Sequence, residues 1–196
     1  MNIESYLQLF LEAGDLPKEM MRREDNRKVE SSANAGAAFA PCQGEHWGLA
    51  VWTSPDSSRL PLERLVDIRW VFSNEAQADT FHKAMLDKNR DGEPLLPDAP
   101  KVGTDCYIFG GANVSQAYYA MTGKTIIITQ FIYIFRVANV VVKLYTLGRE
   151  GVSSDNQKLT VAMVKQIAEK IVLRIDSGNP PKKLRCGNDC FLDDAE

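Results

Sequence analysis

The chain has 196 residues, of which 44% are hydrophobic and 25% are charged, and its formal net charge is −3. A chain of this length and composition buries a core without metal ions or crosslinks. The slight acidic excess argues against nucleic acid or an anionic membrane surface as a partner, and no apolar run reaches the ~18 residues that a membrane-spanning helix needs. We expect one domain over residues 1–181 and a polar, acidic tail over residues 182–196.

An amphipathic helix is predicted at the start of the chain, where apolar residues recur at helical spacing. Gly14 and Pro17 predict where this helix ends. The same stretch has no basic segment followed by an apolar core, so it does not predict a signal peptide. The apolar stripe of the predicted helix consists of Ile3, Tyr6, Leu7, Phe10 and Leu11.

Two strands are predicted over residues 47–53 and 65–72, where alternate side chains point to opposite sides of a sheet. In the second strand, Asp67 and Arg69 face away from the apolar side. That apolar side consists of Val66, Ile68, Trp70 and Phe72. A strand with one apolar side is typical of a sheet that packs against a further layer.

A helix is predicted over residues 75–88, because apolar residues form a narrow stripe there. Ser73 or Asn74 is the expected N-cap, since both side chains accept hydrogen bonds from free backbone N–H groups. His82 lies on this helix at the edge of the stripe, so we expect it at the border with solvent and without a chemical role.

The second half of the chain is dominated by predicted strands. The longest of them is apolar on both sides, which is typical of a central strand. Only Ala138 and Asn139 separate it from the next strand, and this spacing predicts a hairpin. The four predicted strands are residues 105–109, 116–121, 125–137 and 140–147.

The last predicted element is a helix over residues 160–175, which Thr160 can cap. Its apolar stripe consists of Val164, Ile167, Ala168, Ile171 and Ile175. Consecutive strands with short connections favour antiparallel pairing. We therefore predict an α+β fold, with a twisted antiparallel sheet of about six strands and helices packed on it.

Catalytic motifs are absent from the sequence. It has no serine nucleophile elbow, no phosphate-binding loop and no dinucleotide fingerprint. His46 and Asp105 are the residues best suited to act as a base, but no spacing pairs either of them with a second catalytic group. We therefore assign no catalytic residue and expect no cofactor.

Four cysteines admit two disulfides with three possible connectivities. Cys186 and Cys190 are close enough in sequence to bridge if the backbone turns between them. A zinc site would normally show two tight cysteine pairs, and the chain has one loose pair, so we expect no metal. Reduced thiols in a cytosolic protein are the alternative to disulfides. The candidates for disulfide formation are Cys42, Cys106, Cys186 and Cys190.

Several short stretches follow one another in an order that is typical of one family. A strand-then-helix element, "DIRWVFSNEAQADTFHKAM" (residues 67–85), precedes a glycine-aspartate strand start, "VGTDCYIF". A hairpin with a valine run, "FRVANVVVKLYTLG" (residues 135–148), precedes the closing helix "LTVAMVKQIAEKI". Near the N-terminus, Asp15-Leu16-Pro17 follows the first helix and "APCQG" precedes the first strand. Together these stretches resemble the mycobacterial LpqN-type lipoproteins and the related extracytoplasmic sensor domains of mycobacterial serine/threonine kinases.

This resemblance implies a sensor or carrier module that has a groove over a twisted sheet, usually contains disulfides and lies outside the cytoplasm. The chain departs from the family at three places. Ala138 stands where the family has a glycine in the hairpin turn, and a positive φ there would cost an alanine about 1 kcal/mol. Asp105 follows Thr104 instead of a glycine, and Cys106 lies inside the strand start, so disulfide pairings do not carry over. If the lack of a signal peptide is genuine, the protein is cytoplasmic.

We therefore predict a non-catalytic binding module that holds a small apolar or amphipathic ligand, or a protein partner, in a groove over its sheet. The ligand-binding residues that we expect are His46, Trp47, Trp52 and Arg136. Arg136 can orient an anionic group, or it can form a structural ion pair with Asp67 or another acid. The alternatives are a cofactor-independent isomerase or hydrolase that uses the same groove, and a soluble interaction protein of the immunity type.

Overall fold

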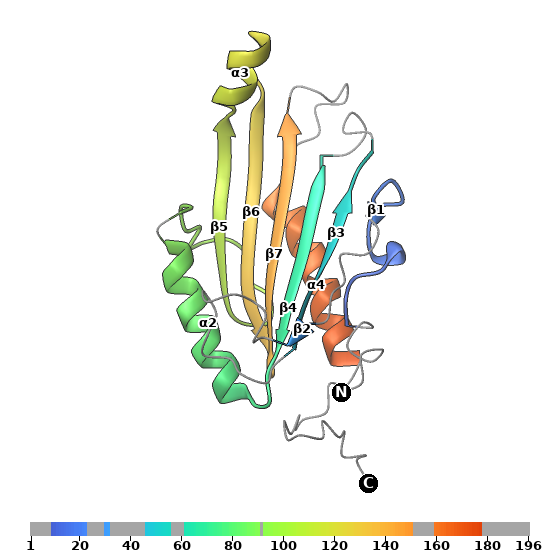
Figure 1. The fold of residues 1–196 in the computed structure, drawn as a ribbon, viewed down its shortest axis with the longest axis vertical. Coiled ribbons are helices and arrows are strands. Elements are labelled where there is room, and N and C mark those ends of the chain that lie inside the picture. Colours follow the sequence, from blue (N-terminus) through green and yellow to red (C-terminus); the bar gives the residue numbers. More distant parts are fainter. Residues whose placement is uncertain are drawn as a thin grey trace.

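One sheet with helices on both of its faces makes up the described part of the molecule (Figure 1). The computed structural model describes residues 9–22, 30–31, 46–55, 61–90, 92–150 and 159–177. The predicted tail over residues 182–196 lies outside them. In chain order the elements are η1 (Ala13–Asp15), β1 (Met21–Arg22), β2 (Glu30–Ser31), β3 (His46–Thr53), β4 (Arg64–Val71), α2 (Glu75–Arg90), β5 (Thr104–Val114), α3 (Gln116–Thr122), β6 (Ile127–Val137), β7 (Val140–Glu150) and α4 (Val161–Ser177).

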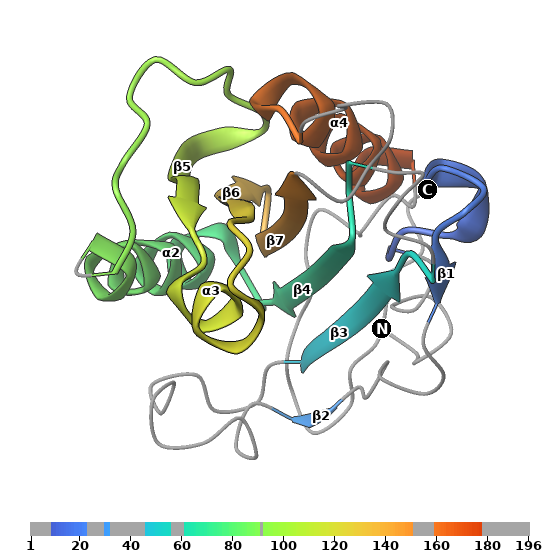
Figure 2. The ribbon, with the colours of Figure 1, turned by 90° about the horizontal axis from the view of Figure 1, so that it is seen from above.

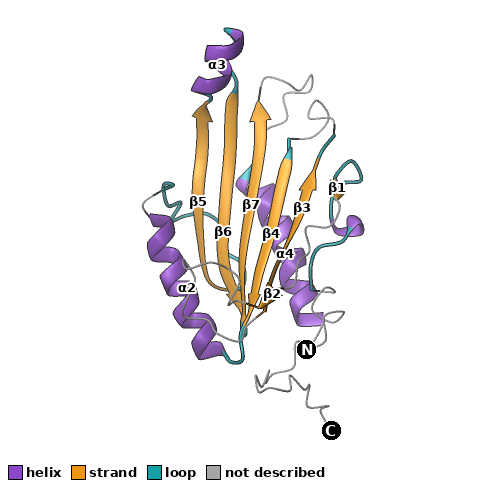
Figure 3. Ribbon diagram, viewed as in Figure 1, coloured by secondary structure: helices purple, strands orange, loops and turns teal. Residues whose placement is uncertain are grey.

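The sheet is antiparallel at every strand pair that the structure describes. Its strand order is β1-β3-β4-β7-β6-β5, and β2 pairs with β3 beside this path. The β6–β7 hairpin therefore lies inside the sheet, between β4 and β5, as its apolar faces predict. Figure 3 shows the strands and helices of this α+β fold, which confirms the predicted fold class.

Helices α2 and α4 pack on opposite faces of the sheet (Figure 2). The α4 face holds the larger core, to which β6 contributes Tyr133 and Phe135. On the other face, α2 packs against Ile132 and Ile134, which alternate with them along β6. The buried residues of α4 are Val164, Ile167, Ala168, Ile171 and Ile175, which confirms the predicted stripe.

Both predicted helix caps are present. The Asn74 side-chain oxygen accepts a hydrogen bond of 2.9 Å from the backbone N–H of Gln77 at the start of α2. The hydroxyl of Thr160 accepts one of 3.3 Å from the backbone N–H of Met163 at the start of α4. These bonds satisfy N–H groups that have no partner within their own helix, so the polar residues before each stripe define where the helices begin.

Residues 9–11 lie over β4 on the α4 face and are buried, but they are not helical. The rest of the predicted N-terminal helix lies outside the described residues. The backbone N–H of Leu11 donates to the Asp67 carboxylate at 3.4 Å, and the Arg69 guanidinium stacks on the Phe10 ring at 4.9 Å. Asp67 and Arg69 do face away from the apolar side of β4, as predicted. They are nevertheless fully buried, because this segment covers them.

The hairpin between β6 and β7 turns through Ala138, whose φ is 48°. This is the positive φ that the resemblance implies, and it is strained for an alanine. Asn139 holds the turn in place, because its backbone oxygen accepts a 3.0 Å hydrogen bond from the N–H of Phe72 and its side-chain amide donates to the Phe72 carbonyl. The end of β4 thus supports the strained turn.

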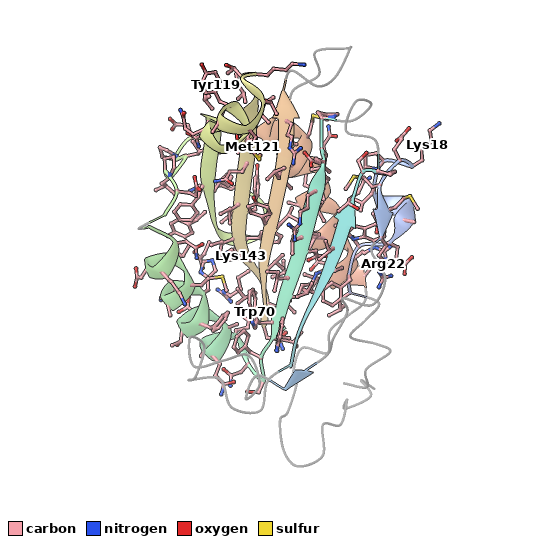
Figure 4. All side chains as sticks on the ribbon, turned by 45° about the horizontal axis from the view of Figure 1, so that its top comes forward. Lys18, Arg22, Trp70, Tyr119, Met121 and Lys143 are labelled. Atoms are coloured by element: carbon pink, nitrogen blue, oxygen red, sulfur yellow. The ribbon has the colours of Figure 1, made fainter. Side chains whose placement is uncertain are left out.

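The sequence-based prediction of a strand over residues 116–121 is wrong. These residues form the short helix α3 at the tip of the β5–β6 connection, where Tyr119 and Met121 are exposed (Figure 4). The backbone N–H of Gly123 donates to the carbonyl of Tyr119 at 2.8 Å, and Gly123 has φ 67°. A glycine with left-handed backbone ends a helix, so this local signal prevails over the β-propensity of two adjacent tyrosines.

Candidate functional site

The face of the sheet that carries α2 has an apolar region beyond this helix. The strand registers align Leu49 with Ile68 and Lys143 in one row across the sheet, and Val51 with Val66 and Tyr145 in the next. We call these residues the β3–β4–β7 patch. Apart from the buried Val51 they are all half-buried. Helix α2 contacts β6 and β7, and Figure 2 shows β4 and β3 extending beyond it.

Polar side chains lie along one border of the β3–β4–β7 patch. The hydroxyl of Tyr145 donates to Gln130 Oε1 at 3.2 Å, and the amide of Gln130 donates to Glu93. The ammonium of Lys143 donates to Asn89 Oδ1 at 2.9 Å. Apolar side chains with a few fixed polar groups beside them form the kind of surface that orients a small ligand.

Lys143 is the cation of this border, and it makes no ion pair among the described residues. Burial and the charge of Lys88 both lower the pKa of the Lys143 ammonium. Burial raises the pKa of the Tyr145 hydroxyl, an effect that Arg64 opposes and Glu93 increases. Both shifts act toward the neutral side chain, and a bound anion would oppose the shift at Lys143 by stabilising the ammonium.

The structure separates the ligand-binding residues that the sequence predicts. Trp47 and Arg136 lie in one row across the α2 face of the sheet. Trp70, which is labelled in Figure 4, and Val141 lie between them. Trp52 is buried on the α4 face. His46 pairs with Val71 in β3, and its side chain lies outside the described part of the chain. The indole N–H of Trp47 is buried without a hydrogen-bond partner among the described residues.

Arg136 forms structural ion pairs at the end of the sheet. Its guanidinium lies 3.4 Å from the Asp105 carboxylate and 3.7 Å from that of Glu75, and it donates to the carbonyl of Ala138 at 3.1 Å. It thus joins the start of β5, the start of α2 and the hairpin turn. Asp67, which the sequence offered as a partner, pairs with Arg69 instead.

The sequence did not single out Lys143 and Tyr145, which the structure makes candidate site residues. The signal that identifies them is the alternation along residues 141–145, in which Val141, Lys143 and Tyr145 share one side of the strand. A lysine between apolar neighbours on one side of a central strand is unusual, because lysine is seldom buried without a partner.

Cys106 is a free, buried thiol whose pKa is raised by burial. The other three candidate disulfide residues, Cys42, Cys186 and Cys190, lie outside the described residues. The disulfide prediction for them stays a prediction. Within the described residues there is no group of three potential metal ligands and no helix long and apolar enough to cross a membrane.

His82 is buried, and its predicted place at the solvent border is wrong. Its side chain is 1% exposed, and its ring centroid lies 5.9 Å from that of Tyr107 on β5. The spacing of apolar residues along α2 predicts only which side of the helix is apolar. It does not predict that Tyr107, a residue of β5, lies against His82 at the edge of that side. Burial lowers the pKa of His82, and a hydrogen bond to the backbone of Ile134 opposes this effect. The folded protein therefore favours a neutral imidazole.

We expect His82 to make folding pH-dependent. The unfolded chain takes up a proton at the ordinary pKa of 6.5, whereas the folded chain takes it up only at lower pH. The free energy of unfolding is therefore highest above this pH and falls below it, by up to about 1.4 kcal/mol per pH unit for one proton. Urea unfolding of wild type and His82→Gln between about pH 7.5 and 5.5 measures this difference. His46 is present in both proteins, so parallel profiles would contradict the prediction.

Comparisons with known proteins returned one match. No protein-family model and no curated protein matches the chain. Among solved structures, the chain is similar to the extracellular domain of PknH from Mycobacterium tuberculosis, with a TM-score of 0.46 and 15% sequence identity. The match covers 90% of this chain and 97% of that one. A likeness of this size does not assign the chain to a family, and no comparison shows an LpqN-type lipoprotein.

Proposed function

We propose that the protein is a non-catalytic binding module that holds a small apolar or amphipathic ligand on the β3–β4–β7 patch. The observation that carries this proposal is the pair of half-buried rows across β3, β4 and β7, where apolar side chains adjoin the hydroxyl of Tyr145 and the ammonium of Lys143. Covering these apolar side chains with a ligand removes their surface from water, which supplies the main driving force for binding.

Two half-open pockets elsewhere in the described part are small, with volumes of about 130 and 110 Å³. Ligand cavities usually measure roughly 300 Å³ or more. Neither of these two pockets has room for such a ligand, so neither competes with the patch as its site.

The catalytic alternative has less support in the described residues. Asp105, one of its two candidate bases, is 51% exposed and pairs with Arg136. A general base needs an orientation toward the proton that it removes, and this ion pair points the carboxylate at a cation instead. His82 is buried beneath Tyr107, away from the patch.

Binding of a neutral apolar probe tests the proposal. We expect N-phenyl-1-naphthylamine, whose fluorescence increases in apolar surroundings, to bind the wild-type protein. Ile68→Asp should weaken this binding about ten-fold or more, because it places a charge where the apolar probe lies. Val66→Thr, which keeps the side-chain shape, should weaken it less.

The matched control is Leu173→Asp, which adds the same charge on the exposed side of α4. Thermal melts must show that each variant is folded. No binding by wild type, or equal binding by wild type and both patch variants, would show that the patch is not a ligand site.

A further inference from the structure

Lys143 differs from most of the arginines that the structure places in similar surroundings. Four partly or fully buried arginines have a carboxylate within 4 Å: Arg69, Arg136, Arg149 and Arg174. The half-buried Arg22 lies over the Trp52 ring instead. Lys143 is half-buried and has no carboxylate partner among the described residues. Its one hydrogen bond goes to the neutral side chain of Asn89. An ammonium has three donors, so two remain for another acceptor.

The charges around Lys143 are mostly positive. Lys88 acts on it with a like charge, and Arg64 lies on the same face, close enough to act on Tyr145. Glu93 is the acidic group of this border, and it binds the amide of Gln130. A half-buried cation beside another cation is stabilised by an anion, because less water is available to solvate its charge.

We propose that the ligand of the β3–β4–β7 patch carries an anionic group, a carboxylate or a phosphate, which Lys143 binds beside the hydroxyl of Tyr145. This inference rests on the proposed function. Lys143 and Tyr145 are two residues apart on one side of β7, so both can reach a single headgroup. From there the apolar residues Leu49, Val66 and Ile68 extend across two strand spacings, roughly 10 Å, which suits an apolar chain attached to that headgroup.

The sequence offered Arg136 either for this role or for a structural ion pair, and we propose Lys143 for the role instead. Arg136 is neutralised by Asp105 and Glu75 at the end of the sheet. A cation that already has two carboxylate partners gains little from a third anion. Lys143 lies in the row next to Arg136 and on the adjacent strand, and no carboxylate of the described residues pairs with it.

The test compares alkyl ligands that share one chain and differ in headgroup. Dodecanoate, dodecyl phosphate and uncharged 1-dodecanol compete with N-phenyl-1-naphthylamine for wild type and for Lys143→Met, which has a similar length and no charge. We expect wild type to bind at least one of the two anions about ten-fold or more tightly than dodecanol, because hydrogen bonds to charged groups are the stronger ones. Lys143→Met should lose this preference and keep its affinity for dodecanol.

Three further variants separate the effect of the Lys143 charge from that of the Lys143 side-chain structure. Lys143→Arg should keep the preference for an anion, and Lys124→Met, which removes an exposed lysine elsewhere, should not change it. Lys143→Gln serves as a second uncharged variant. The relative affinities for dodecanoate and dodecyl phosphate distinguish a free fatty acid from a phosphate headgroup.

The outcomes separate this inference from the proposed function. If wild type binds dodecanol as tightly as both anions, or if the uncharged variants keep the preference for anions, the anionic site is wrong and the apolar ligand site stands. If wild type binds neither the probe nor any of the alkyl ligands, the proposed function and the anionic site are both wrong.

Discussion

Replacing Ile171 by aspartate is expected to unfold the protein, or to lower its free energy of unfolding by about 4 kcal/mol or more. Ile171 is fully buried at the centre of the α4 stripe, in the same core as Tyr133 and Phe135 of β6. A carboxylate there has no positive partner and loses its hydration. Because small domains are stable by only about 5–15 kcal/mol, a cost of this size removes much of the total.

Urea unfolding followed by circular dichroism measures the effect, with Leu173→Asp as the control. Leu173 lies two residues further along α4 and is 65% exposed, so the same substitution should change stability by no more than about 0.5 kcal/mol. Ile171→Ala should fall between the two, at about 2–5 kcal/mol, because it removes apolar contacts without adding charge. Similar unfolding curves for Ile171→Asp and wild type would mean that α4 does not dock on the sheet.

The sequence was sufficient to predict the sheet and its two long helices, because these elements depend on local periodicity. Strand β3 begins one residue before the predicted range of 47–53, and α2 ends two residues after that of 75–88. The two-residue spacing at Ala138 and Asn139 defines the central hairpin. In each of these elements, the spacing of the apolar residues and the residues at the two ends indicate the same secondary structure over the same range.

Residues 116–121 show where local patterns mislead. Tyr118 and Tyr119 favour a strand, and a segment this short gives too few repeats to distinguish a period of two from one of 3.6. The helix is decided by Gly123, which follows it with a left-handed backbone. A prediction that treated Gly123 as the residue that ends a helix would have favoured α3 over a strand.

Burial of polar residues depends on contacts between distant segments, which periodicity does not show. Residues 9–11 cover Asp67 and Arg69, although 56 positions separate Leu11 from Asp67. Tyr107 similarly covers His82. Both cases require knowing which segment lies over which face of the sheet.

The candidate site lies on the sheet, as the sequence predicted, but it consists of other residues, and it stays a proposal. The expectation of an apolar groove came from the abundance of apolar and aromatic strand residues. Trp47 and Trp52 are an odd number of positions apart, so strand alternation alone already places them on opposite faces. That no described carboxylate pairs with Lys143 depends on the strand order and on the position of α2, which the sequence does not reveal.

The buried ion pair between Asp67 and Arg69 gives the second large expected effect. The two side chains are fully buried and share two hydrogen bonds, of 2.9 and 2.8 Å. Asp67→Leu should destabilise the protein by about 3–5 kcal/mol, because it leaves the Arg69 guanidinium buried without its carboxylate. It also removes the acceptor for the backbone N–H of Leu11, so the segment over β4 loses an anchor.

A double-mutant cycle separates the stabilisation that comes from the interaction between Asp67 and Arg69 from the effect of each side chain alone. Arg69→Met alone should also be strongly destabilising, whereas Asp67→Leu combined with Arg69→Met should recover most of the loss, since apolar residues of similar size replace a buried pair at little cost. Asp105→Asn is the control, because it weakens the exposed pair with Arg136 and should cost no more than about 1 kcal/mol. If the double variant is as unstable as the sum of the single variants, the two charges do not depend on each other. The stability of this region would then come from the packing of residues 9–11 and not from the ion pair beneath them.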